Sequence, residues 1–146
     1  MAWSAFEWKF FNQDRLRLQD GLTLPEKIDR YVVTAVERGL NIEPLQQQIN
    51  HFSERYIRGR ALDELRLSDV QLSRADRELL LDVLNGDRHG SRDVVGALLK
   101  LVAQIRHLTI HGAKWAEGLN EYADNFFHCT DILIFVIEGV EVRIAD

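Results

Sequence analysis

The chain has 146 residues, 46% of them hydrophobic, and its 18 Lys and Arg against 23 Asp and Glu give a net charge of −5. This length and composition are typical of one packed domain, which we place over residues 1–146 because no linker or repeat divides the chain. The acidic balance argues against binding long nucleic acid through a broad basic face. Residues 88–116 are the least acidic stretch and leave room for a local basic site.

Membrane-spanning and secretory features are missing from the sequence. The longest apolar run, residues 132–137, is far shorter than the roughly 18 residues that cross a bilayer. The N-terminus lacks the basic start and long apolar stretch of a secretory signal, and the single Cys cannot form an internal disulfide. We therefore expect a cytoplasmic protein with no membrane partner.

The N-terminal residues fit two structures. Alternating apolar and charged residues over 6–18 predict a short hairpin about residues 12–14. A helix with Trp3, Phe6 and Phe10 on one face fits nearly as well. The pattern leaves both open.

The next segment predicts an amphipathic helix. Thr23 can cap it, Pro25 lies in its first turn, and Gly39 is expected to end it. Its apolar residues recur at helical spacing: Ile28, Tyr31, Val32, Ala35 and Val36.

Two shorter helices are predicted after it. One begins near residues 41–43 and ends before Gly59, with Leu45, Ile49, Phe52, Tyr56 and Ile57 as its apolar residues. The other follows Ser73 and closes at Gly86, after which residues 86–90 form a loop.

The strongest helical signal lies between Ser91, a good N-cap, and Gly112, a good terminator. One broad apolar stripe runs along it, made of Val94, Val95, Leu98, Leu101, Val102, Ile105 and Leu108. The last segment, residues 119–137, is also helical in spacing, although residues 132–144 could instead form a hairpin. Four or five such helices predict an all-α, up-and-down bundle, with a short β-hairpin possible at the N- or C-terminus.

The end of the strongest helix carries the one suggestive chemical motif, Arg106-His107-Leu108-Thr109-Ile110-His111-Gly112. In a continuous helix, five residues separate Arg106 and His111 by about 140° around the axis and about 7.5 Å along it. A helix that stops near Ile110 would let His111 turn back toward Arg106. Two copies that meet across a two-fold axis could also bring the groups together.

An arginine and a histidine suit cleavage of a phosphodiester by its own 2′-hydroxyl. Histidine can serve as base or acid near neutral pH, and arginine offers a charged, planar set of donors that matches phosphate oxygens. This chemistry needs no metal and no cofactor.

The same run resembles the Arg-x4-His signature of HEPN-domain proteins, in which a polar residue such as His107 commonly follows the Arg. The resemblance implies a helical bundle that forms a homodimer through the motif-bearing helices and has metal-independent endoribonuclease activity at the seam. It also implies that Arg106 holds the phosphate, His111 is the general base or acid, and His107 assists. A role as a toxin or phage-defence nuclease, with an antitoxin or operon-encoded protein partner, follows from the same resemblance. Some family toxins carry a Tyr that is adenylylated where this chain has Ala113.

Alternatives for the motif remain. Arg106 and the two histidines could be ordinary surface residues at a helix end. His107 and His111 have the spacing of a metal pair, but Leu108 stands where a zinc peptidase needs Glu, so we expect no metal site. The rival function is a non-catalytic helical module that dimerises and binds a protein or nucleotide.

Other candidates lie around the motif. We take Arg88, Lys114 and Trp115 as candidate substrate-binding residues, although a solvated turn explains Arg88 and simple packing explains Trp115. Cys129 beside His128 is expected to be a buried, inert thiol rather than a nucleophile, because consecutive helical residues point about 100° apart.

Overall fold

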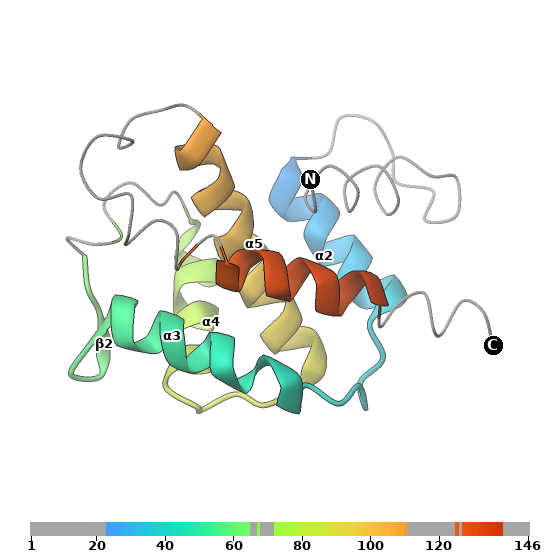
Figure 1. The fold of residues 1–146 in the computed structure, drawn as a ribbon, viewed down its shortest axis with the longest axis horizontal. Helices are drawn as coiled ribbons and strands as arrows, with labels where there is room; N and C mark the ends of the chain where they lie inside the picture. Colours follow the sequence, from blue (N-terminus) through green and yellow to red (C-terminus); the bar gives the residue numbers. More distant parts are fainter. Residues whose placement is uncertain (1–22, 65–66, 68–71, 111–124, 126, 139–146) are drawn as a thin grey trace.

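The structure is a computed structural model that describes residues 23–64, 67, 72–110, 125 and 127–138. Its elements are the helices α2 (Leu24–Ala35), η2 (Glu43–Leu45, a 3-10 helix), α3 (Gln46–Tyr56), α4 (Arg74–Leu84) and α5 (Ser91–Ile110), the strands β1 (Ile57–Arg58) and β2 (Ala61–Leu62), and a helix over residues 127–138 (Figure 1). The prediction of an all-α fold is confirmed, while the predictions for the N-terminal segment and for residues 139–144 lie outside the described residues.

Helix α2 begins as the sequence predicts and ends earlier. Thr23 and Glu26 form a capping box, in which each side chain satisfies a main-chain N–H of the other residue. The helix ends at Ala35 rather than at Gly39, because Val36 turns into extended backbone and is buried in the core. Arg92 then donates to the main-chain oxygens of Val33 and Val36 at 3.0 and 2.7 Å, which satisfies carbonyls at the helix end.

Helix α3 is shorter than the pattern predicts at both ends, because residues 43–45 form the 3-10 helix η2 and Ile57 leaves the helix to form a strand. Ile57 pairs with Leu62, and Arg58 with Ala61, in a two-stranded antiparallel sheet. Gly59 takes a φ of +67° in the connecting turn, a conformation that glycine adopts without steric cost. A short hairpin that the sequence analysis did not predict therefore lies in the middle of the chain.

Helix α4 confirms its predicted boundaries. The side chain of Ser73 accepts a hydrogen bond from the main-chain N–H of Asp76 at 3.2 Å. Gly86, with a φ of +78°, follows the end of the helix.

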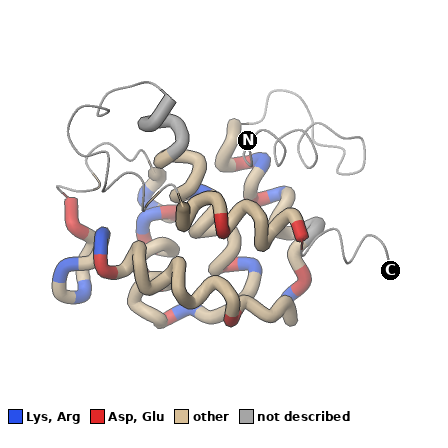
Figure 2. The backbone as a smooth tube through the Cα atoms, viewed as in Figure 1, with Lys and Arg blue, Asp and Glu red and all other residues tan. Residues whose placement is uncertain are grey.

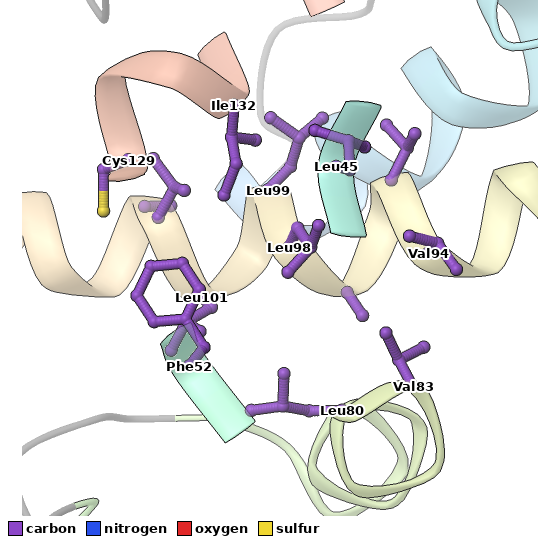
Figure 3. Packing of buried hydrophobic residues seen from close by; sticks show 14 of the residues in the cluster. Leu45, Phe52, Leu80, Val83, Val94, Leu98, Leu99, Leu101, Cys129 and Ile132 are labelled. Atoms are coloured by element: carbon purple, nitrogen blue, oxygen red, sulfur yellow. The ribbon is translucent and has the colours of Figure 1, made fainter. Parts of the chain in front are cut away.

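Helix α5 is the centre of the molecule, and its apolar surface is wider than the predicted stripe. Apolar residues between 94 and 105 are buried on all sides, including Ala97, Leu99 and Ala103 outside that stripe. In Figure 3, Ile132 and Cys129 pack on one side of this helix while Leu80 and Val83 of α4 lie on the other. A helix that is apolar all round is buried between its neighbours, so α5 is the scaffold on which the other helices pack.

Ser91 corrects the predicted start of α5. It is the first residue of the helix rather than its N-cap, and it is buried. Its hydroxyl donates to the main-chain oxygen of Glu37, so it joins α5 to the loop after α2 instead of accepting from its own helix. The main-chain N–H of Val94 bonds to the oxygen of Gly90, which places Gly90 at the helix boundary.

Residues 127–138 form a helix, so the alternative of a hairpin beginning at residue 132 is wrong. Ile132, Leu133 and Val136 are buried in the same core as α5, at three- and four-residue steps. In the described part of the chain, no helix combines the length and apolar character that crossing a bilayer would need.

Candidate functional site

The Arg-x4-His motif begins on the last turn of α5. The backbone of Arg106 and His107 belongs to this helix, which extends to Ile110. Just before the motif, Ala103 and Ile105 are 6% and 7% exposed, so the helix is still anchored in the core at this point.

The remaining parts of the predicted site lie outside the described residues. These are His111, Lys114 and Trp115, together with the side chains of Arg106 and His107. The structure therefore fixes where the motif starts and leaves its assembly as a prediction. The spacing of His107 and His111 as a possible metal pair also involves residues that lie outside the described part of the chain.

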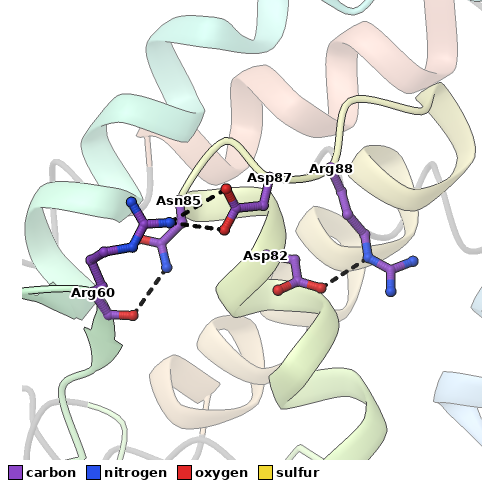
Figure 4. Close-up of polar contacts among 5 residues, drawn as sticks. All are labelled: Arg60, Asp82, Asn85, Asp87 and Arg88. Carbon is purple, nitrogen blue, oxygen red and sulfur yellow. Dashed lines mark hydrogen bonds and ion pairs between the residues drawn. The ribbon is translucent and has the colours of Figure 1, made fainter.

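Arg88 lies at the other end of α5. Its guanidinium pairs with Asp82 at 3.0 Å (Figure 4). It also pairs with Asp93 at 3.5 Å. Its hydrogen bond to Asp82 is the main reason that the pKa of Arg88 is raised. Fifteen residues of helix separate Ser91 from Arg106, a rise of about 22 Å, so Arg88 is not beside Arg106 in the same chain.

A second arginine holds the hairpin against the loop after α4. Arg60 pairs with Asp87 at 3.1 Å, and the side-chain amide of Asn85 donates to the main-chain oxygen of Arg60 at 3.0 Å (Figure 4). Basic and acidic residues are interspersed in this part of the surface (Figure 2). These arginines are held by carboxylates, which lowers their value as phosphate contacts.

A polar network that the sequence did not predict joins α3 to the C-terminal helix. The rings of His51 and His128 stack, with centroids 4.0 Å apart and planes inclined by 23°. His51 Nε2 lies 2.7 Å from the side-chain oxygen of Asn125. Gln48 Nε2 lies 3.5 Å from His128 Nδ1 and 3.4 Å from a carboxylate oxygen of Asp131.

The hydrogen bonds assign the protons of this network. An amide NH₂ can only donate, so Gln48 donates to Nδ1 of His128, and that nitrogen is unprotonated. The side-chain oxygen of Asn125 can only accept, so Nε2 of His51 carries a proton. Gln48 and Asn125 are 4% and 2% exposed, so both amides need these partners. Two stacked imidazoles are therefore held face to face by buried amides.

Two further groups beside the network stay neutral. Burial raises the pKa of Tyr56, against the opposing effects of Arg55 and Asn125. Burial also raises the pKa of the Cys129 thiol to about 12. The expectation of a buried, inert Cys129 agrees with this burial and leaves no nucleophile beside His128.

The network does not form a metal site. Within the described ranges, no group of three or more His, Cys, Asp or Glu side chains is arranged to hold an ion. One nitrogen of each ring is already engaged by an amide, which removes it from coordination.

A sequence signal for the network exists in hindsight. Gln48 and His51 are three residues apart on α3, and Asn125, His128 and Asp131 repeat at the same step along the last helix. Each set is a polar row bordering an apolar stripe, and such rows are usually solvated. Nothing in one sequence says that two rows will face each other.

No protein-family model matches this chain, and no curated protein or solved structure matches it.

Proposed function

We propose that the protein is a metal-independent endoribonuclease, folded as a HEPN-like up-and-down bundle, that cuts single-stranded or loop RNA at a dimer-interface site. In this site Arg106 holds the scissile phosphate, His111 is the general base or acid, and His107 assists or orients. Lys114 and Trp115 are its proposed substrate contacts. A toxin or phage-defence role, with an antitoxin or operon-encoded partner, belongs to the same proposal.

The observation that carries the proposal is the place of the motif on α5. Arg106 and His107 occupy the last turn of the central helix, directly after buried turns of the core. Catalysis by positioned groups requires a rigid support, since small displacements of a reacting group are costly. The helix C-terminus also carries partial negative charge, which favours cationic groups there.

In the proposed reaction, one proton is removed from the attacking hydroxyl and one proton is added to the leaving oxygen. A base removes the proton from the 2′-hydroxyl, and the resulting oxygen attacks the adjacent phosphorus. The bond from phosphorus to the 5′-oxygen breaks, and an acid protonates that oxygen as it leaves. The products are a 2′,3′-cyclic phosphate and a 5′-hydroxyl. A homodimer supplies two copies of His111, one for each step, and the charge of Arg106 stabilises the phosphorane-like transition state.

Exposed apolar residues support the dimer. Phe127 and Ile134 are 67% and 42% exposed and lie seven residues apart, on one face of the C-terminal helix. A second copy would remove this face from water. Phe127→Glu should therefore produce a folded monomer with reduced cleavage in light scattering and activity assays. Val33→Glu, an equally exposed site on α2, should leave the dimer intact.

The central experiment incubates the protein with single-stranded and hairpin RNA in excess EDTA. We expect cleavage that leaves 2′,3′-cyclic phosphate ends, and a loss of at least about 100-fold in His111→Ala and Arg106→Ala. A substrate with 2′-deoxyribose at the cleavage position should stay intact. His89→Gln, at an exposed loop histidine, is the matched control and should cleave normally.

Two results would contradict the proposal: equal cleavage by wild type and His111→Ala, or loss of cleavage on chelation. A folded dimer without any cleavage would favour the non-catalytic adaptor instead.

A further inference from the structure

The contact between α3 and the C-terminal helix includes two stacked histidine rings. The rings lie 4.0 Å apart, and Nδ1 of His128 accepts from the side-chain amide of Gln48. Histidine is the side chain whose charge ordinarily changes between about pH 5 and pH 8. We infer that the His51–His128 stack is a pH-sensitive contact, which docks the helix over residues 127–138 on α3 at neutral pH and loosens it in acid.

Repulsion is the first reason for this behaviour. Among the described residues of these two helices, the titratable groups within five positions of the pair are Glu54, Arg55, Tyr56, Cys129 and Asp131. Tyr56 and Cys129 are neutral in this range because burial raises the pKa of each. Asp131 and Glu54 can offset positive charge here, but two imidazoliums stacked 4.0 Å apart would repel each other directly. The charged groups packed nearer the centre, Lys100 and Asp76, already balance each other.

Lost hydrogen bonding is the second reason. A proton on Nδ1 of His128 would face the NH₂ group of Gln48, which can only donate. Gln48 is 4% exposed and would keep only its hydrogen bond to Asp131, so water cannot easily replace the lost acceptor. Protonation therefore removes a contact as well as adding a charge.

The single cysteine gives a local measure of docking. Cys129 is 7% exposed and lies next to His128, so it reacts with a thiol reagent only when this helix opens. We would measure its reaction rate with 4,4′-dithiodipyridine at about pH 7.5 and about pH 5, a range chosen to span histidine titration. Dividing the rate of the urea-unfolded protein by the native rate at the same pH gives a protection factor that is corrected for thiolate content.

In the wild type we expect the protection factor to fall about tenfold from the higher pH to the lower, as repulsion across the stack develops. His51→Gln and His128→Asn keep amide groups near the positions of Nε2 and Nδ1 and cannot take up the proton. In either variant the fall should be less than about twofold. His89→Gln is the control and should retain the response of the wild type.

An unchanged protection factor in the wild type, or an equal fall in both stack variants, would overturn the inference. If a variant does not fold, NMR titration of the imidazoles in the wild type tests the inference instead. Two separated steps for His51 and His128 support the coupled pair, and two independent curves like that of His89 contradict it. Neither measurement depends on RNA cleavage, so the result is separate from the proposed nuclease activity.

Discussion

Two polar clusters hold the helices around the core, and they differ in the nature of their charge. In one, the ammonium of Lys100 lies 2.7 Å from Asp29 and 2.6 Å from Asp76, which joins α5 to α2 and α4. In the other, two stacked imidazoles and two buried amides join α3 to the C-terminal helix. The first cluster is held by ion pairs, and the second by ring stacking and hydrogen bonds.

The difference predicts that the two sides of the molecule respond to different conditions. Burial alone would lower the pKa of Lys100, but the hydrogen bonds and charges of Asp29 and Asp76 outweigh it and raise the pKa. The lysine is therefore charged throughout the range in which histidine titrates. The Lys100 cluster should therefore keep its charge in that range, whereas the inference above predicts that the His51–His128 contact loosens.

The largest expected effect comes from breaking the charged cluster. Lys100 is 5% exposed, and Lys100→Met would leave the partly buried Asp76, 16% exposed, without its cation. We expect a loss of about 3 kcal/mol in the free energy of unfolding, measured by urea denaturation. Arg74→Met removes an exposed ion pair with Glu78 and should cost less than about 1 kcal/mol. Equal losses in the two variants would show that burial of the charge is irrelevant.

The same cluster gives a pH prediction with the opposite sign to that of the histidines. Because folding raises the pKa of Lys100, its contribution is fully present below the unfolded value of about 10.4. It is lost as the pH rises through the higher folded value. Stability of the wild type should therefore fall in strong base more steeply than that of Lys100→Met, as denaturation at a series of pH values would show.

The next effect tests the cluster of stacked imidazoles. Asn125 is 2% exposed and accepts a hydrogen bond from His51 Nε2, so Asn125→Ala removes the partner of that N–H. We expect a loss of about 2 kcal/mol in the free energy of unfolding. Asn50→Ala, at an exposed position on α3, should stay within about 0.5 kcal/mol of the wild type. A small loss in Asn125→Ala would mean that the network is not important for docking.

The two clusters also show what the sequence could and could not predict. Helix α4 was predicted to its boundaries, because Ser73 and Gly86 act through their own neighbours in the chain. The early end of α2 was missed, because it depends on Arg92, which lies more than fifty residues away. The width of the buried surface on α5 was missed for the same reason, since it follows from how many helices pack around it.

The candidate site also has parts that the sequence could predict and parts that it could not. The placement of Arg106 and His107 on the strongest predicted helix followed from local periodicity, whereas the effect of Gly112 stays a prediction. The stack of His51 and His128 did not, because it joins residues 77 positions apart through a packing arrangement that no local pattern encodes. Arg88 was attractive as an isolated cation, but its carboxylate partners became visible only in three dimensions.

The smallest expected effect separates a local cap from a tertiary contact. Ser73 accepts from the N–H of Asp76 within its own helix, whereas Ser91 donates to the main-chain oxygen of Glu37. Replacing either serine with alanine should cost about 1 kcal/mol of unfolding free energy, so alanine cannot tell them apart. Aspartate can tell them apart, because it accepts but does not donate hydrogen bonds when ionised. Ser73→Asp keeps its cap, whereas Ser91→Asp would bury a carboxylate against a carbonyl oxygen. Urea denaturation should find Ser73→Asp close to the wild type and Ser91→Asp less stable than Ser91→Ala. If Ser91→Asp is instead more stable than Ser91→Ala, Ser91 acts as an N-cap.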